Sequence, residues 1–296
     1  MALYGSIEGG GTKFVCAVGS TPENLRAEVR FPTTTPDETL GRAIEFFTGR
    51  GPLDAIGVAM FGPLVLDKES PDYGRVGPTP KPDWTGADIV GPLRAAFNIP
   101  IGFDTDVNGA ALGEGRWGAG AGLDHIVYIT IGTGIGGGVV NNEQPLHGLV
   151  HPEIGHLRVP RHPDDTFAGS CPFHGDCLEG LASGPAIAER WGAPAEDLGA
   201  DTARAVEMAA YPLGFALADL VLTLSPERII LGGGVAQLPG LLEATRRMML
   251  DALGGYVDSP ELEKGACHYV VAPKLGRASG IAGGLVLAER AAYLLQ

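Results

Sequence analysis

Residues 126–138 read IVYITIGTGIGGG, a strand-like apolar run that passes directly into a glycine-rich turn. The same arrangement occurs as GSIEGGGTK at residues 5–13 and as RIILGGG at residues 228–234. Glycine lets a backbone approach a ligand closely and adopt positive φ, and unpaired N–H groups in such turns form concavities that bind anions. Three such turns in one chain predict a nucleotide held along its length, with its phosphates at two turns and its adenosine at the third.

The first turn resembles a truncated P-loop but lacks the G-x-x-x-x-G-K-[ST] spacing, which argues against a Walker fold. The hydroxyl of Thr12 is expected to bond a phosphate and Lys13 to supply charge, while a solvated strand position remains open as the alternative for Lys13. The expected nucleotide contacts are Gly9, Gly10, Gly11, Thr12 and Lys13, then Gly132, Thr133 and Gly134, and finally Gly232, Gly233 and Gly234.

The second turn also fits the dinucleotide pattern G-x-G-x-x-G, with glycines at 132, 134 and 137. That motif requires a helix directly after the turn. Here the sequel is GVVNNE, an apolar run that ends in an Asn-Asn turn, which favours a strand and a hairpin. A plain tight hairpin without phosphate contact is the remaining alternative.

Composition limits the class of protein. The chain has 296 residues, 45% of them hydrophobic and 19% charged, which is enough for two packed domains. The net charge of −14 argues against a nucleic-acid partner. We see no export signal and no apolar run near membrane-spanning length, so we expect no membrane partner and a cytoplasmic location. Four cysteines do not make a disulfide scaffold.

The order of predicted elements indicates two α/β units of similar pattern. Strands are predicted at 3–8, 13–19, 53–59, 100–103 and 268–272, besides those on both sides of the second glycine turn and the one before the third. Helices are predicted at 39–49, 89–97, 109–117, 184–191, 202–224, 239–252 and 278–294, and the Pro-, Gly- and Asp-rich residues 67–86 predict a long loop. Two α/β domains that face each other across a cleft are what a closing kinase needs.

Residues 104–108 read DTDVN and place two carboxylates at the end of a strand. Transfer of a phosphoryl group to a hydroxyl needs a carboxylate that orients and deprotonates that hydroxyl. Asp106 is our candidate for this general base. The alternative is that Asp106 or Asn108 only caps the helix that follows.

Residues 171–177 read CPFHGDC, a C-x2-H-x2-C cluster that favours Zn²⁺ held by Cys171, His174 and Cys177. A structural site needs a fourth ligand, for which His156 is the best candidate and His151 and His162 are alternatives. Two free thiols in a surface loop, or a disulfide, are the other interpretations. A zinc-locked loop would present the flanking carboxylates of Glu153 and Glu179 to sugar hydroxyls.

The motifs together resemble the ROK family (repressors, open reading frames and sugar kinases), and within it the bacterial fructokinases. The similar segments are the first and second glycine turns, GPTPKPDW at 77–84, FDTDVN at 103–108, HPEIGH at 151–156 and residues 171–183. The resemblance runs nearly end to end and in order.

The resemblance implies the actin-like ATPase (ribonuclease H-like) fold and ATP-dependent phosphorylation of fructose at its 6-hydroxyl. It implies Asp106 as general base and a structural Zn²⁺ on His156, Cys171, His174 and Cys177, with Mg²⁺ entering with ATP and commonly a homodimer. It implies domains at 1–115 plus about 278–296 and at 116–277. The substrate contacts expected are Gly62, Thr105, Asp106, Glu153, His156 and Glu179.

Three departures from the family pattern bear on this reading. Family glucokinases carry Glu-Asn-Asp where this chain has Asp104-Thr105-Asp106, which weakens a glucokinase assignment. Gly109 replaces the usual alanine, a change expected to loosen the start of the helix. Glu8 stands where actin-like ATPases often have Asp, so metal contact there stays open.

A kinase for mannose or glucose is the second candidate function, and a sugar-sensing regulator, which would need a preceding DNA-binding domain, is a distant third.

Overall fold

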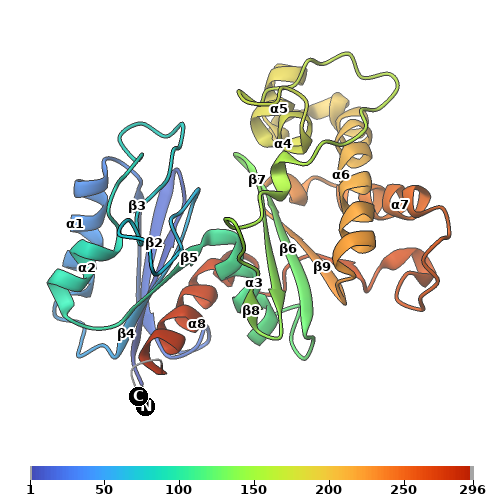
Figure 1. Cartoon of the computed structure of the whole chain (residues 1–296). Helices are drawn as coiled ribbons and strands as arrows, with labels where there is room; N and C mark the ends of the chain where they lie inside the picture. Colours follow the sequence, from blue (N-terminus) through green and yellow to red (C-terminus); the bar gives the residue numbers. More distant parts are fainter. Residues whose placement is uncertain (1, 294–296) are drawn as a thin grey trace. The chain divides into compact units, whose positions relative to one another are not determined.

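The computed structural model describes residues 2–293 and divides into two compact units (Figure 1). The first unit comprises the described residues up to Gly122, Val140–His151 and those from Lys274 onward. The second comprises Leu123–Val139 and Pro152–Pro273.

Residues 140–151 belong to the first unit, whereas the sequence-based boundary assigned them to the larger domain. Side chains from this segment are anchored in the first unit. His147 bonds to Asp104, and the ring of His151 accepts a hydrogen bond from the backbone of Leu64.

The sheet of the first unit has five strands in the order β3-β2-β1-β4-β5. β2 lies antiparallel to β1 and β3, whereas β4 and β5 continue parallel to β1. The predicted hairpin around the first glycine turn is therefore confirmed, and β3 is a strand that the sequence analysis missed. The strands are β1 (Tyr4–Gly9), β2 (Lys13–Gly19), β3 (Leu25–Pro32), β4 (Ala55–Met60) and β5 (Ile101–Thr105).

The register of the parallel strands brings three motifs to one edge of this sheet. Gly9 lies opposite Met60, and Met60 lies opposite Thr105. The next residues along the chain are the first glycine turn, the Phe61-Gly62 turn and Asp106. Sequence segments about fifty residues apart therefore emerge side by side at the carboxyl ends of β1, β4 and β5.

Helices cover both faces of the first sheet (Figure 1). α1 (Pro36–Phe47) and α2 (Val90–Phe97) lie on one face, and α3 (Asp106–Trp117) and α8 (Ser279–Tyr293) lie on the other. Glycines allow α8 to lie directly on the strands, because a Cβ at Gly57 would meet the carbonyl oxygen of Gly284 at 1.8 Å.

Gly109 has a packing function rather than a loosening one. A Cβ at this position would lie 2.5 Å from Cβ of Ala59 on β4. A Cβ on Gly283 of α8 would meet the carbonyl oxygen of Gly109 at 1.9 Å. α3 begins at Asp106, three residues before the predicted start, so Gly109 lies inside the helix and lets it approach β4 and α8. The expectation that Gly109 loosens the start of the helix is therefore wrong, because glycine at this position allows close packing.

Glu114 of α3 is fully buried and joins two distant parts of the chain. Its carboxylate accepts hydrogen bonds from the backbone N–H of Ala119, where the chain is about to leave the first unit, and from those of Lys274 and Leu275, where it returns. The hydroxyl of Ser279 at the start of α8 donates a further bond of 2.6 Å. The buried charge is thus stabilised by several donors.

The loop predicted at 67–86 is confirmed, since residues 61–89 form only isolated bridges and turns. Trp84 anchors this loop: it is fully buried, and its indole N–H donates to the carbonyl of Thr34 at 2.8 Å. Its ring packs against those of Phe14 and Phe61. Packing of this kind holds the Phe61-Gly62 turn at the sheet edge.

The second sheet has the order β10-β9-β6-β7-β8. β6 and β7 flank the second glycine turn, so the predicted hairpin is confirmed, and the absence of a helix after this turn removes the dinucleotide motif. The strands are β6 (His125–Ile131), β7 (Ile135–Asn141), β8 (Gln144–Pro145), β9 (Arg228–Gly232) and β10 (Val270–Val271). β6 and β9 are parallel, with Thr130 opposite Gly232, so the second and third glycine turns leave the same edge.

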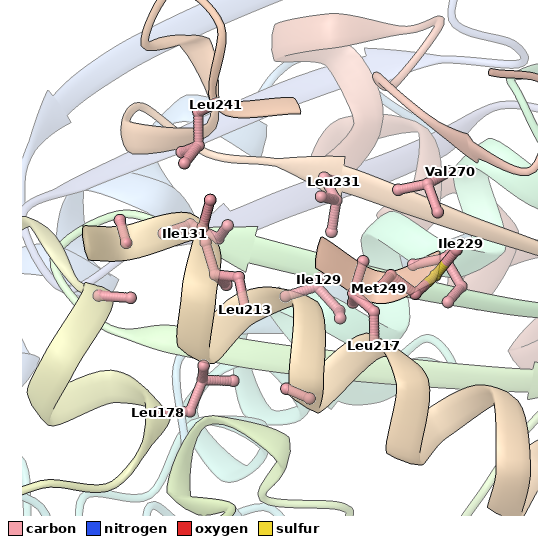
Figure 2. Close-up of a cluster of buried hydrophobic side chains, with 14 of the residues drawn as sticks. Ile129, Ile131, Leu178, Leu213, Leu217, Ile229, Leu231, Leu241, Met249 and Val270 are labelled. Atoms are coloured by element: carbon pink, nitrogen blue, oxygen red, sulfur yellow. The ribbon is translucent and has the colours of Figure 1, made fainter. Parts of the chain in front are cut away.

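Alternate residues of β6 and β9 form the core of the second unit with its helices (Figure 2). Ile129, Ile131 and Leu231 meet Leu213 and Leu217 in this cluster. The helices are α4 (Leu178–Ala182), α5 (Gly184–Trp191), α6 (Thr202–Leu224) and α7 (Leu241–Leu253).

α6 corrects one expectation from the sequence. With the turn before it, it forms a helical segment of 26 residues with a mean hydropathy of 1.5 in its most apolar window, so one described helix is long and apolar enough to span a bilayer. However, 72% of that window is buried inside the protein, where α6 packs on the second sheet. Its apolar character therefore has an explanation in the core.

Candidate active site

The end of β5 places the two carboxylates of DTDVN in opposite surroundings. Asp104 is 2% exposed. It accepts hydrogen bonds from the backbone N–H of Thr105 at 2.8 Å and from the side-chain amide of Asn108 at 2.7 Å. Its oxygens also lie 3.1 and 3.2 Å from the ring Nε2 of His147. Asp104 therefore organises the head of α3.

Asp106, the candidate base, is the first residue of α3 and is partly exposed. One of its oxygens accepts the N–H of Val107 at 2.9 Å. The helix cap is neither Asp106 nor Asn108, as the alternative had it, but Thr105, whose hydroxyl accepts the N–H of Asn108 at 3.1 Å. Thr105 is itself 2% exposed, so its predicted contact with a substrate competes with this capping bond.

His147 is a residue that the sequence analysis did not single out. Its hydrogen bond to Asp104 raises the pKa of the imidazole, and the charge of Asp104 acts in the same direction, while partial burial and the nearby charge of Lys68 oppose the shift. A histidine 43 residues from its partner, in a polar segment, gives no periodic or spacing signal. Only the fold brings the two residues together.

The first glycine turn is held by its own backbone and by the end of β3. The N–H of Gly10 donates to the carbonyl of Lys13 at 2.9 Å, and the hydroxyl of Thr33 donates to the carbonyl of Gly10 at 2.7 Å. Gly11, Thr12 and Lys13 are exposed. The turn is thus a fixed loop with an accessible tip, which is the shape that phosphate contact requires.

Glu8 connects this turn to the head of α3. Burial raises the pKa of Glu8, the charge of Lys13 lowers it, and that of Asp106 raises it further. Its carboxyl group fills the space over Gly280 of α8, where an added Cβ would lie 2.6 Å from it. Lys13, Glu8 and Asp106 therefore form one electrostatic neighbourhood at the sheet edge.

Gly62 lies next to His151, whose ring would be 3.3 Å from an added Cβ. His151 is 7% exposed, and its Nε2 accepts the N–H of Leu64 at 3.2 Å. The ring therefore supports the Phe61-Gly62 turn. This arrangement removes His151 from the possible metal ligands.

The second glycine turn is clamped on two sides within the second unit. The N–H of Gly132 donates to the carbonyl of Gly134 at 2.9 Å, and the N–H of Gly184 on α5 donates to the carbonyl of Gly132 at 2.7 Å. The carboxylate of Glu179 accepts the N–H of Ile135 at 2.9 Å. It would clash with a Cβ on Gly134 at 2.6 Å. Glu179, assigned from the sequence to the sugar, thus also fixes this turn.

The third turn has a packing reason for two of its three glycines. A Cβ at Gly232 would meet the hydroxyl of Tyr128 at 2.2 Å. Gly233 has a φ of +92°, and a Cβ there would meet the backbone of Ile131 at 2.2 Å. Gly234 is exposed and faces open space. Nucleotide contact remains a prediction for this turn, and Gly234 has the accessibility it requires.

The predicted metal ligands His156, Cys171, His174 and Cys177 come together, with their ligand atoms all within 4.8 Å of one another. The two sulfurs lie 3.5–3.8 Å from the nearest Nδ1 atoms. A tetrahedral Zn²⁺ with ordinary Zn–S and Zn–N lengths separates sulfur from nitrogen by roughly 3.6 Å. The donor set therefore fits zinc in both chemistry and spacing.

The other possible ligand, His162, lies elsewhere. Its ring packs edge-on against Tyr211, with centroids 5.1 Å apart, and its Nε2 is 3.7 Å from Glu207. Asp176, inside the cluster loop, is held instead by Arg158 at 2.6 Å and Arg161 at 3.1 Å. The hydrogen bond from Arg161 lowers the pKa of Asp176.

Glu153 precedes the short helix Ile154–His156, which packs tightly on β7. A Cβ at Gly155 would lie 1.8 Å from the carbonyl oxygen of Ile135. Close contact at Gly155 fixes His156 for the cluster and leaves Glu153 exposed one turn earlier. The exposed position is compatible with the sugar contact predicted for Glu153.

Two α/β units, each with glycine turns at the carboxyl edge of its sheet and one with an accessible aspartate there, define a protein of the actin-like ATPase fold. Residues 4–291 match the ROK family. The chain belongs to the ROK family.

Three similar proteins illustrate the relationship. A fructokinase of Zymomonas mobilis is 46% identical over 97% of this chain and 96% of its own. The crystal structure of a ROK hexokinase from Thermus thermophilus has a TM-score of 0.76 and 28% identity, covering 97% of this chain and 98% of the other. A ROK family glucokinase from Streptomyces griseus, solved with glucose and AMPPNP, has a TM-score of 0.74 and 27% identity, covering 98% and 100%.

Proposed function

We propose that this protein is a fructokinase that transfers the γ-phosphoryl group of ATP to the 6-hydroxyl of fructose. Family membership and the solved sugar kinases support phosphorylation of a sugar by ATP. The choice of fructose is supported by the 46% identity to a fructokinase, against 27% to the glucokinase of known structure. The Asp-Thr-Asp sequence in place of Glu-Asn-Asp points the same way.

The mechanism rests on one observation: Asp104 and Asp106, both at the end of β5, lie in different surroundings. Asp104 is committed to Thr105, Asn108 and His147, whereas Asp106 lies partly exposed at the sheet edge. In the proposed step, a carboxylate oxygen of Asp106 accepts the proton of the 6-hydroxyl. The sugar oxygen bonds to the γ-phosphorus, the bond from this phosphorus to the bridging oxygen breaks, and ADP leaves.

The glycine turns are proposed to hold the nucleotide phosphates by backbone N–H groups, with Lys13 adding charge. Both clamped turns have fixed backbones before any ligand arrives, so little ordering is needed when the phosphates bind. Mg²⁺ is expected to arrive with ATP and to neutralise phosphate charge. The carboxylates of Glu8 and Asp106 supply oxygen donors of the type that this ion prefers.

Zn²⁺ is proposed to be structural. Four protein ligands close a tetrahedral site and leave no position for a reacting group. The site would hold the loop that carries Glu153 and Glu179, whose carboxylates are proposed to bind sugar hydroxyls. Within the second unit this loop also reaches the second glycine turn through Glu179. The zinc loop would thus position groups for both substrates.

The experiment that tests the function is an ADP-release assay with ATP–Mg²⁺ across fructose, mannose, glucose and N-acetylated hexoses. We expect fructose to give the highest kcat/KM and the product to be the 6-phosphate, identified by NMR. Dominant turnover on mannose or glucose would support the kinase activity but contradict fructose as the substrate. Absence of turnover on every sugar would contradict the proposal that the protein is a sugar kinase. The homodimer implied by the family resemblance and the cytoplasmic location both stay predictions.

A further inference from the structure

A pocket of about 770 Å³ lies beside β5 in the first unit. Its lining comes from β5, the end of α2, the loop before α2, α8 and the segment around β8. None of the described residues that line it belongs to the first glycine turn, to the Phe61-Gly62 turn or to Asp106. This volume is typical of sites that enclose a small molecule.

The charge of the pocket is opposite to that of the chain. In a chain of net charge −14, the described lining contains three cationic side chains, Lys68, Arg94 and Arg290, and one carboxylate, Asp104. The carboxylate is already bonded to Asn108 and His147. A local positive excess of this kind attracts an anion even on an acidic protein.

The cations stand on different elements and around one space. Arg94 is exposed on α2 and lies over the ring of Tyr73, 5.8 Å from its centroid. Arg290 is half-buried on α8. Its guanidinium donates to the backbone carbonyl of Glu143 and lies 3.9 Å from the side-chain carboxylate of the same residue. Guanidinium groups match the oxygens of a phosphate with paired hydrogen bonds.

The body of the pocket offers more than charge. Leu287, Ile101 and Phe103 supply an apolar wall. The ring of His147 and the hydroxyl of Tyr73 add polar groups. β5 is the outermost strand of its sheet, so no strand of the described chain pairs with its outer side. A ligand with hydroxyl groups as well as phosphate would find donors and acceptors here.

We propose that this pocket binds a small phosphorylated metabolite, such as a sugar phosphate, at a second site that adjoins the candidate active site through Asp104 and His147 but contains none of the predicted nucleotide or sugar contacts. Arg94 and Lys68, the two exposed cations, hold the phosphate, Arg290 adds positive charge from α8 beside Glu143, and the polyol part lies against β5 and His147. The inference rests on the pocket, and only the use of fructose in the test, to occupy the sugar site, rests on the proposed function.

The test is isothermal titration calorimetry of the full chain with fructose 1,6-bisphosphate, fructose 6-phosphate and inorganic phosphate, each in the presence of saturating fructose. We expect one site for the bisphosphate and at least tenfold weaker binding of inorganic phosphate. Equal affinity for the sugar phosphates and for inorganic phosphate would reduce the pocket to an anion site and overturn the proposal. Bisphosphate binding that is seen in a parallel titration without fructose but is lost in its presence would assign the binding to the sugar site and overturn the proposal as well.

Variants locate the binding. Arg94→Ala is expected to weaken binding of the bisphosphate at least tenfold, and addition of Lys68→Ala to weaken it further; both side chains are exposed, so folding should be kept. Arg42→Ala is the matched control, because Arg42 is also an exposed helical arginine, 5.9 Å from the centroid of an aromatic ring, and does not line the pocket. Unchanged binding in the Arg94 variants, or an equal loss in Arg42→Ala, would refute the assignment.

Discussion

Asp104 and Asp106 are two residues apart, yet the fold assigns them different tasks. The side chain of Asp104 is a buried acceptor for three donors, and that of Asp106 is accessible at the sheet edge. The same substitution at the two positions should therefore separate stability from catalysis.

We expect Asp106→Asn to lower kcat by about 10²–10⁴-fold, because the proton acceptor is lost while the shape of the side chain is kept. Its unfolding midpoint in urea should stay close to that of the parent. Asp104→Asn is the matched control and should lose stability instead, by about 1–3 kcal/mol, because the oxygen that faces His147 becomes an NH2 donor and the charge that pairs with the imidazole is lost. Near-parental turnover in Asp106→Asn would remove this residue from the mechanism.

His147 should make stability depend on pH. Its hydrogen bond to Asp104 raises the pKa of the folded state, so the folded protein binds the proton more tightly than the unfolded chain does. The stabilisation is complete below the unfolded pKa, about 6.5, and is lost as pH rises through the folded pKa. With the side chain 40% exposed, we expect a contribution of only about 0.5 kcal/mol.

The measurement is urea unfolding of the parent and of His147→Gln at about pH 6 and about pH 8.5. The difference in free energy of unfolding should be larger at the lower pH. His268→Gln, outside the network, serves as the control. A difference that is constant with pH would refute the coupling to Asp104.

At the scale of the element, α3 depends on glycine for its position. A methyl group at Gly109 would meet Ala59, so Gly109→Ala should destabilise the protein by about 1–3 kcal/mol through overpacking. Gly41 of α1 is also a helical glycine, but an added Cβ meets no atom within 4 Å. Gly41→Ala should therefore stabilise by about 0.5–1 kcal/mol. Denaturant titrations that gave both variants the same sign would contradict this difference.

The zinc loop provides a second prediction about an element. Protein purified from zinc-containing medium should hold about one Zn²⁺ per chain by elemental analysis, and Cys171→Ser should lose it together with activity, because a closed site needs all four ligands. Cys267→Ser is the control, since this partly exposed thiol lies outside the cluster. Full activity and unchanged stability in the metal-free protein would contradict a structural role for zinc at this cluster.

The elements also show which sequence signals were sufficient. Long apolar periods predicted α5 and α6 to the residue. β3 was missed although Leu25, Ala27, Val29 and Phe31 alternate with polar or charged residues, a pattern that itself indicates a half-buried strand. Local chemistry predicted the cysteine–histidine cluster. The role of His147 depended on tertiary contacts between distant segments, which no local pattern contains.

At the scale of the whole molecule, two α/β units, each with a glycine turn between strands, were predicted from the order of elements and from the family resemblance. The boundary between the units was not predicted, because residues 140–151 begin inside β7, whose earlier residues belong to the second unit, yet are held in the first by His147 and His151. Side-chain anchoring, rather than chain continuity, decides where this segment belongs.

The position of α8 has a consequence for how the protein is made. This helix covers β1, β4 and β5, and the start of it supplies donors to the buried carboxylate of Glu114, yet a ribosome synthesises it after every residue of the second unit. The first unit is therefore the first to be synthesised and the last to complete its fold. During translation, nascent chains in which Pro273 has just emerged from the ribosome should show a protease-resistant second unit and a first unit that is still cleaved. Resistance of both units at that point would contradict this order of folding.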